Sequence, residues 1–285
     1  MRGFYLCSKM GDLGIISLLI VLVNAFVSYK GLSDGVYFRQ YAFVITKILG
    51  DRDYKRLITS GFLHVNWIHF SVNMVTLYCF GSGLEAVFGP LFFLLLYFGS
   101  LLGGNLLSLY VHRNHTDYSA VGASGAVSGI VFASIALFPG MEIGFLMLPL
   151  SFPAWAFGLA YVLYSIYGIQ VQRDNVGHEA HLGGGIIGLC VAVVSYPEVL
   201  SYNYLPVLLI LVPSVVFLYF VFTKPAFLLV KQLERESVYR DIDERYYAKK
   251  RHKELELNKL LEKIHENGIE SLSQHEKQRL KELSE

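Results

Sequence analysis

The stretch 121–129, Val121-Gly122-Ala123-Ser124-Gly125-Ala126-Val127-Ser128-Gly129, places a serine among glycines and alanines. It heads the apolar run 130–137, which predicts a membrane-spanning helix. Side chains no larger than methyl let a second helix approach closely in lipid, and they leave the Ser124 hydroxyl uncovered. Taken alone, the stretch favours a packing face with Gly125 and Gly129 four residues apart. A nucleophilic serine is the alternative, and it needs support from the rest of the chain.

The composition is that of a membrane protein. The chain has 285 residues, of which 54% are hydrophobic and 16% charged, whereas soluble domains carry about 25% charged residues. Residues 231–285 hold 13 of the 24 basic and 13 of the 23 acidic residues, so the remainder is strongly apolar. This segregation predicts an all-α polytopic membrane protein with a charged tail. The balanced charge of the tail gives no reason to expect nucleic-acid binding.

Seven apolar segments approach the length of about 20 residues that crosses a bilayer. They run over residues 13–27, 67–87, 91–110, 122–137, 152–169, 181–195 and 205–222. We expect a six-span core over residues 1–200, a seventh C-terminal span within 201–230 and a helical tail over 231–285. The connection 28–63 is too polar to span and too apolar to be a free loop, so it is expected to fold at the membrane interface. The tail has a partial leucine stripe, which fits a solvated helical pair or a module that docks an unknown partner.

Polar residues inside membrane spans are costly and tend to be functional. His69 and Asn73 are four residues apart in the second span, so both lie on one face and can donate hydrogen bonds toward a common point. A single histidine at the end of a span is more often structural, but the pair is harder to explain by packing.

The sixth span carries a second bare face. His181, Gly184 and Gly188 lie at offsets of three and seven, so this face presents little besides the imidazole. It can pack against the face of Ser124 and Gly125. A serine needs a base within about 3 Å to be nucleophilic at neutral pH, and His181 is the best-placed candidate.

A metal site is the competing interpretation of His178-Glu179-Ala180-His181. The zinc-protease helix needs histidines four residues apart, and these are three apart. The three cysteines, Cys7, Cys79 and Cys190, are scattered without the spacing of a thiolate site or a disulfide framework. We therefore expect neither a metal nor a cofactor.

In their order and spacing, these residues resemble the rhomboid intramembrane serine proteases. The motifs that carry the resemblance are Tyr54-Lys55-Arg56, His64 with His69 and Asn73, Gly81 with Glu85 and Gly89, Gly122-Ala123-Ser124-Gly125, and Ala180-His181 with Gly184 and Gly188. The first of these departs from the usual pattern, because rhomboids commonly have a tryptophan beside the arginine. Together the motifs cover most of the membrane region.

The resemblance implies a role for each residue. Ser124 attacks a peptide carbonyl and His181 takes its proton, a dyad without a third acid. An oxyanion hole consists of His69, Asn73 and the backbone N–H of Ser124. Gly125, Gly184 and Gly188 have structural roles. Arg56, His64 and Glu85 are also structural, and they pin the first loop, which is the connection 28–63, to the core. The substrates are single-span membrane proteins, cut in or beside the bilayer.

Two further features depart from the family pattern. Ser128 stands where rhomboids often have an aromatic ring stacked on the catalytic histidine, so the effect of this serine on the orientation of His181 and on the catalytic rate is left open. The second departure is topological, because the positive-inside rule puts the connection after the first span in the cytoplasm. That connection holds six basic residues against two before the span: Lys30, Arg39, Lys47, Arg52, Lys55 and Arg56 against Arg2 and Lys9. The resemblance implies the opposite orientation for the core, which we adopt, and the side of the tail stays open.

Two other functional classes remain as alternatives. A catalytically inactive rhomboid-like protein would bind and route membrane clients, although such relatives usually lack the serine or the histidine. A channel or transporter would use His69, Asn73 and His181 as a proton path. We expect a multi-pass protein of a bacterial plasma membrane, since no organelle-targeting extension is evident.

Overall fold

The computed structural model describes residues 14–115, 118–144, 151–171 and 176–223, together with Lys263, Ile264, Ser273 and Leu280. The chain divides into two compact units, Met1–Val230 and Lys231–Glu285. The predicted helical tail lies almost entirely outside the described residues and stays a prediction. The following description concerns the first unit.

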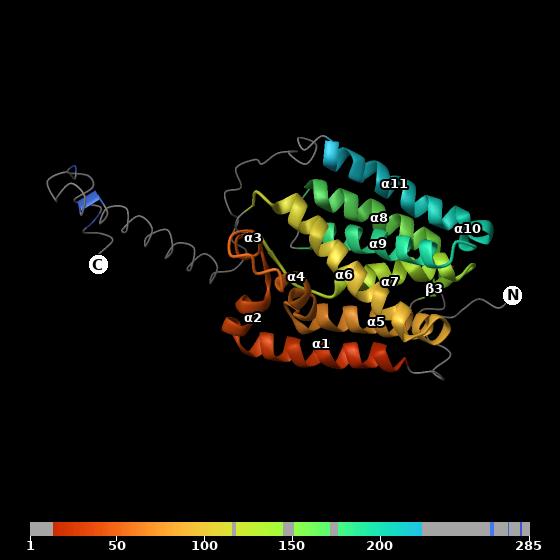
Figure 1. The fold of residues 1–285 in the computed structure, drawn as a ribbon, viewed down its shortest axis with the longest axis horizontal. Helices are drawn as coiled ribbons and strands as arrows, with labels where there is room; N and C mark the ends of the chain where they lie inside the picture. Colours follow the sequence, from red (N-terminus) through yellow and green to blue (C-terminus); the bar gives the residue numbers. More distant parts are fainter. Residues whose placement is uncertain are drawn as a thin grey trace. The chain divides into compact units, whose positions relative to one another are not determined.

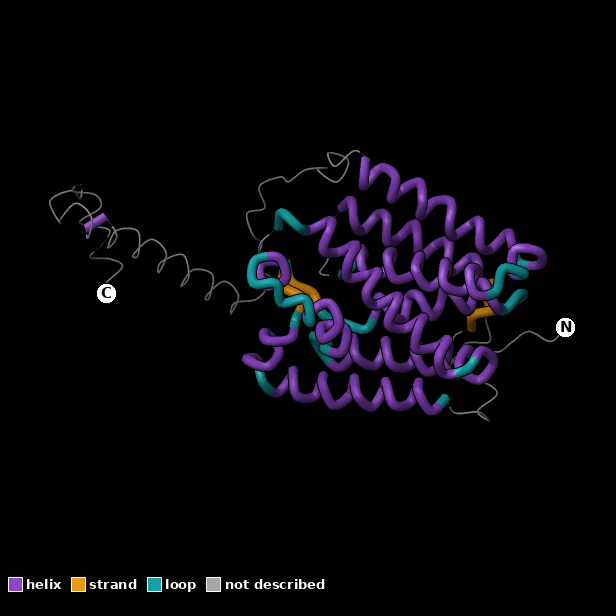
Figure 2. The backbone as a smooth tube through the Cα atoms, viewed as in Figure 1, coloured by secondary structure: helices purple, strands orange, loops and turns teal. Residues whose placement is uncertain are grey.

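The first unit is a bundle of long helices (Figures 1 and 2). Seven of them match the seven predicted spans: α1 (Ile15–Ser33), α5 (Trp67–Phe88), α6 (Pro90–His112), α7 (Ser124–Leu137), α8 (Ala154–Val171), α9 (His178–Ser195) and α11 (Tyr204–Thr223). Among the described helices, five are long and apolar enough to cross a membrane, namely α1, α6, α8, α9 and α11. The predicted all-α polytopic membrane fold is confirmed.

The helix α7 is the centre of the bundle. It packs against α5, α6, α8 and α9, between which it lies in Figure 1, and every residue after Ser124 is buried. Its 14 residues give a length of about 21 Å, which is shorter than the hydrocarbon core of about 30 Å. The helix α7 is therefore too short for its two ends to reach both membrane surfaces.

The first helix is longer than predicted. Its expected end was residue 27, and α1 continues to Ser33. Lys30 is accommodated in the last turn, where a cation is favourable, and its Nζ lies 4.7 Å from the centre of the Tyr37 ring. The helix ends where Asp34 caps the next one, by accepting the backbone N–H groups of Val36 and Tyr37.

The connection from α1 to α5 is folded. It contains α2 (Gly35–Tyr41), β1 (Phe43–Val44), α3 (Ile45–Leu49), α4 (Arg56–Thr59) and the 3₁₀ helix η1 (Ser60–Phe62). Phe43, Ile45 and Ile48 form a small core of its own. The strand β1 pairs antiparallel with β2 (Ser119–Ala120), which joins the connection to the segment that leads into α7.

The opposite end of the bundle carries different elements. A hairpin of β3 (Glu142–Gly144) and β4 (Ser151–Pro153) joins α7 to α8, and the short helix α10 (Val199–Tyr202) precedes α11. Figure 1 shows α2, α3 and α4 gathered at one end, and β3 and α10 at the other. The start of α7 belongs to the first end, because β2 pairs there with β1.

Candidate active site

The helices α7 and α9 contact each other through their backbones. A Cβ atom on Gly184 would overlap the carbonyl oxygen of Gly125, and one on Gly188 would overlap that of Gly129. A Cβ on Gly125 would lie 3.1 Å from the carbonyl oxygen of Ala180. The first turn of α7 therefore lies against the first turn of α9, where Ser124 and His181 are placed.

The backbone before Ser124 has a special conformation. Gly122 adopts a φ of +136°, which L side chains rarely adopt, and its N–H donates to the carbonyl of Ser60 at 3.0 Å. The first loop thus holds the segment that turns into α7. Ser124 is the first residue of this helix and is partly exposed. Its N–H belongs to the first turn, where backbone donors have no intrahelical partner.

His69 faces the same point as Ser124. A Cβ built on Gly122 would lie 3.0 Å from Nε2 of His69 and 3.7 Å from Oγ of Ser124. One N–H of the Asn73 amide donates to the carbonyl of His69 at 3.0 Å. Since an amide carries two donors, the second N–H of Asn73 is available for another acceptor.

His64, in the connection before α5, is fully buried and its tautomer can be deduced. Ser28 Oγ donates its only proton to the carbonyl of Phe62 at 3.0 Å, so it can only accept from Nδ1 of His64 at 2.8 Å. Burial, with a smaller contribution from His69, lowers the pKa of His64 to about 3. His64 is therefore a neutral ring with its proton on Nδ1, packed edge-to-face on the His69 ring at 5.0 Å between centroids.

Arg56 holds the first loop together. Its guanidinium is buried and donates to the carbonyl oxygens of Arg39 at 2.9 Å and Ala42 at 2.6 Å, and to Asp53 at 2.9 Å. Asn105 of α6, which the sequence analysis missed, donates to the carbonyl of Leu57 at 2.7 Å. These contacts bind the loop within itself and to α6.

Glu85 has a different partner from the one expected. Its carboxylate accepts the backbone N–H groups of Ile16 and Ser17, each at 2.8 Å, and the Ser17 hydroxyl at 2.8 Å. It caps the N-terminus of α1, where a negative charge is favourable. The expectation that Glu85 pins the first loop is therefore wrong, because these bonds run to the start of α1.

Glu179, the second buried carboxylate near the site, pairs with a histidine of α6. Glu179 Oε1 lies 3.0 Å from Nε2 of His112, with both side chains buried. Residues two positions apart on a helix do not face each other, so Glu179 and His181 point to different sides of α9. In the part of the chain that is described, no cluster of three His, Cys, Asp or Glu side chains is arranged to hold a metal ion.

A ring stacks on His181 although position 128 is a serine. The ring of Tyr161, from α8, stacks on His181 with 5.7 Å between centroids and 24° between planes. The Tyr161 hydroxyl lies 2.9 Å from Oγ of Ser128. The sequence held one signal, because Gly158, Ser165 and Gly168 mark the face of α8 that turns inward and Tyr161 lies on that face.

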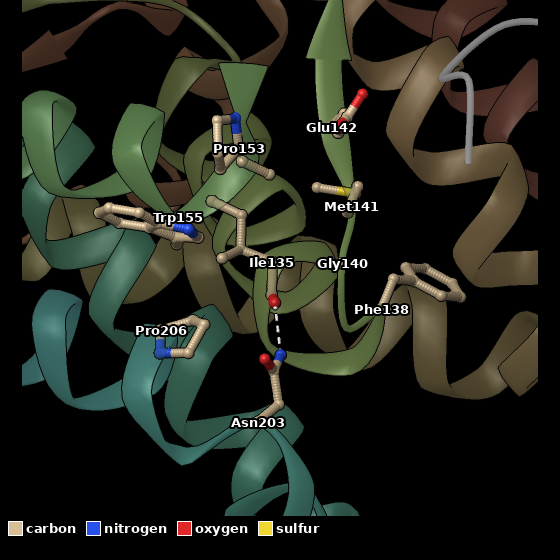
Figure 3. Close-up of a pocket in the computed structure, with 10 residues that line it drawn as sticks. Ile135, Phe138, Gly140, Met141, Glu142, Pro153, Trp155, Asn203 and Pro206 are labelled. Atoms are coloured by element: carbon tan, nitrogen blue, oxygen red, sulfur yellow. Dashed lines mark hydrogen bonds between the residues drawn. The ribbon is translucent and has the colours of Figure 1, made fainter. Parts of the chain in front are cut away.

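A cavity of about 240 Å³ lies elsewhere. It is lined by residues at the C-terminal end of α7, the β3–β4 hairpin and the start of α11 (Figure 3). Ile135, one of these, is 11 residues beyond Ser124, or about 16 Å along the helix. This cavity is therefore separate from the candidate active site.

Comparison with known families identifies the fold of this region. Residues 51–198 match the model of the Rhomboid domain. The chain belongs to the rhomboid family. The matched segment of this rhomboid contains Arg56, His64, His69, Asn73, Glu85, Ser124 and His181. Residues 240–285 match a family of unknown function, DUF6576.

Individual rhomboid relatives are similar to this chain over part of their length. The chain is 32% identical over 136 residues to "Rhomboid protein 1, mitochondrial" of Saccharomyces cerevisiae, covering 47% of this chain and 39% of that protein. It is 28% identical over 188 residues to "RHOMBOID-like protein 12, mitochondrial" of Arabidopsis thaliana, covering 61% and 55%. With YdcA of Bacillus subtilis it shares 40% identity over 91 residues, covering 31% and 45%. This rhomboid thus spans roughly half the length of the relatives it matches.

Proposed function

We propose that this rhomboid is an intramembrane serine endopeptidase in which Ser124 is the nucleophile and His181 the base. The observation that carries the proposal is the backbone contact between Gly125 and Gly184. It brings the first turns of α7 and α9 together, with a hydroxyl on one and an imidazole on the other. Both residues are partly exposed, so a substrate and water can reach them.

The reaction follows from these groups. Ser124 Oγ attacks the carbonyl carbon of a peptide bond while His181 takes the hydroxyl proton. His181 then gives this proton to the leaving amine as the C–N bond breaks and an ester forms on Ser124. Water attacks the ester, with its proton passing to His181, and the acid product and the serine hydroxyl are released.

The developing oxyanion needs donors that are already in place. The N–H of Ser124 lies at the positive end of α7. We assign the other two donors to the ring of His69 and the second N–H of Asn73, both on α5. The closeness of His69 to Gly122 and Ser124 supports its assignment. Losing one such donor typically costs about 100- to 1000-fold in rate.

The short α7 favours a substrate within the membrane. A helix of about 21 Å with all residues after Ser124 buried cannot reach from one membrane surface to the other. If its C-terminal end lies near one surface, Ser124 lies below the other. We therefore propose single-span membrane proteins as substrates, cut where their helix unwinds near its end.

Cleavage of a single-span substrate in proteoliposomes tests the proposal. The wild type should cleave, and Ser124→Ala and His181→Ala should not. Ser134→Ala is the matched control, because Ser134 is a buried serine of the same helix that bonds only the carbonyl of Ile130 in its own turn. Cleavage that survives Ser124→Ala would refute the proposal.

Labelling with a fluorescent fluorophosphonate distinguishes the proposed protease from a catalytically inactive rhomboid. It should label folded wild-type protein at Ser124 and leave Ser124→Ala unlabelled. A folded wild type that neither cleaves nor reacts would instead support a relative that binds and routes membrane clients.

We place the protein in a bacterial plasma membrane. The bacterial relative YdcA supports this location, whereas the other two relatives are named as mitochondrial proteins. Fractionation of the source cells tests this location, and recovery in an organelle membrane would exclude it.

A further inference from the structure

Tyr161 contacts the two helices that carry the dyad residues. Its ring stacks on the imidazole of His181 in α9, at 5.7 Å and 24°. The same ring packs edge-on against Phe132 of α7 at 5.8 Å, and nearly parallel to Phe157 of α8 at 5.7 Å. Its hydroxyl reaches Oγ of Ser128 in α7 at 2.9 Å. The ring is thus fixed on several sides.

The direction of the hydrogen bonds can be assigned. Ser128 Oγ lies 2.7 Å from the carbonyl oxygen of Ser124, and a carbonyl only accepts, so the Ser128 proton points there. Tyr161 must then donate its own proton to Ser128. A chain of contacts runs from the backbone of Ser124, through Ser128 and the Tyr161 hydroxyl, to the ring that lies on His181.

Small residues dock α8 in place around this side chain. Gly158 and Gly168 lie three residues before and seven residues after Tyr161, on the same face. A Cβ on Gly158 would press on the side chain ends of Ile135 and Ile210, and one on Gly168 would overlap the ring of His178. Tyr161 is a long side chain on an otherwise small-residue face, and it reaches across to the dyad.

We propose that Tyr161 is the positioning residue for His181, and that its bond to Ser128 fixes the base relative to the helix that carries the nucleophile. The inference rests on the proposed function of the dyad. Stacking limits rotation of the imidazole, and the hydroxyl bond limits movement of the ring. The base is aligned only while α8 is docked, because Tyr161 belongs to α8. Ser128 and Tyr161 are complementary in size, since a large side chain at position 128 would take the place of the Tyr161 hydroxyl.

Two substitutions separate the ring from the hydroxyl of Tyr161, and a third serves as the control. Tyr161→Leu removes the stacked ring, and we expect kcat and the rate of fluorophosphonate labelling to fall about 10- to 100-fold with little change in KM. Tyr161→Phe keeps the ring and should recover most of this loss, remaining about 2- to 10-fold below the wild type. Tyr167→Leu is the control, because Tyr167 is a tyrosine of the same helix that is 56% exposed.

A double-substitution cycle tests the bond itself. Tyr161→Phe and Ser128→Ala each remove the same hydrogen bond, so the double variant should label no more slowly than the slower single variant. This comparison decides the matter even where Tyr161→Leu fails to fold. Rates are taken per folded molecule, with the folded fraction measured by thermal unfolding in detergent.

The outcomes distinguish the two proposals. A wild type that cleaves and labels, with Tyr161→Leu as fast as Tyr167→Leu, overturns the positioning role and leaves the dyad intact. Independent, multiplying losses in the double variant also overturn it. A folded wild type that neither cleaves nor labels overturns both.

Discussion

The two ends of α7 are built differently. At its start, a Cβ on Gly184 would overlap the backbone of Gly125, and the preceding strand and Gly122 are bonded to the first loop. At its end, Ile135 borders a cavity of about 240 Å³ (Figure 3). One helix therefore has an end that packs backbone to backbone against α9 and an end that borders a cavity.

The contrast between the two ends of α7 shows where positional accuracy is needed. Proposed catalytic groups must be held to within a fraction of an ångström, and the start of α7 is fixed by backbone contacts that leave no alternative packing. The other end has only to terminate the helix. Substitutions at the two ends should therefore separate activity from stability.

The largest effect is expected from Gly184→Ala. The new methyl group would overlap a backbone carbonyl of α7, which cannot rotate away as a side chain does. Overpacking costs about 1 to 3 kcal/mol and occasionally more. The rigid backbone neighbour puts this variant at the upper end of that range, and labelling of Ser124 should be lost. Denaturation in micelles measures the first effect and the fluorophosphonate the second. Gly83→Ala is the control, because a Cβ at Gly83 of α5 meets nothing within 4 Å; equal behaviour of the two variants would contradict the tight contact.

The next effect is expected from Arg56→Ala, in the loop that supports the start of α7. Removing the buried guanidinium leaves the carbonyl oxygens of Arg39 and Ala42 without this donor, and leaves Asp53 with the exposed Lys55 at 3.5 Å. The expected cost is about 3 kcal/mol. Arg56→Lys should lie between, because an ammonium cannot reproduce the planar fork of donors. Lys47→Ala removes an exposed ion pair with Asp51 and should cost less than about 0.5 kcal/mol. Similar losses of unfolding free energy in Arg56→Ala and Lys47→Ala would exclude this role.

The close packing at the start of α7 could largely be predicted from the sequence, whereas the cavity beside its C-terminal end could not. Small residues at helical spacing, such as Gly125 and Gly184, are visible as a pattern, and so are polar residues inside apolar spans. Six of the seven predicted spans begin and end within three residues of the observed helices. The exception is the end of α1, where a lysine in the last turn looks like the start of a loop.

Contacts made by long side chains across helices escaped prediction. The ring on His181 comes from α8, 20 positions away in sequence, and no periodicity assigns Tyr161 to one neighbour rather than another. Glu85 caps α1 from 69 positions away. Such partners depend on how the helices are arranged in space, which a single sequence does not contain.

A third effect depends on pH and concerns His64, which packs on His69 near the start of α7. Its pKa is lowered by burial to about 3 in the folded protein, against about 6.5 unfolded. The unfolded chain therefore takes up a proton below pH 6.5 that the folded chain does not. The contribution of His64 is constant above pH 6.5 and is lost between about 6.5 and 3, by up to about 1.4 kcal/mol per pH unit.

Replacing His64 by asparagine isolates the contribution of His64 to the pH dependence of the unfolding free energy. The Asn side chain keeps a donor for Ser28 and has no proton to gain, so His64→Asn should flatten the fall of unfolding free energy between pH 6.5 and 5. Denaturation of both proteins at a series of pH values measures it. An identical slope would show that other groups cause the pH dependence.

The smallest effect is expected at the C-terminal end of α7, from Asn203→Ala. The Asn203 amide donates to the carbonyl oxygens of Ile135 at 2.9 Å and Ala136 at 2.7 Å. These belong to the last turn of α7, where carbonyls have no intrahelical partner, so Asn203 caps this helix from the segment before α11. Losing the cap should cost about 1 to 2 kcal/mol and leave the labelling rate of Ser124 unchanged, because the cavity beside it absorbs small shifts before they reach the first turn. A fall in labelling as large as that of Gly184→Ala would mean that the two ends of α7 are coupled rigidly, and that the accuracy of the site depends on the whole helix instead of its glycine contacts.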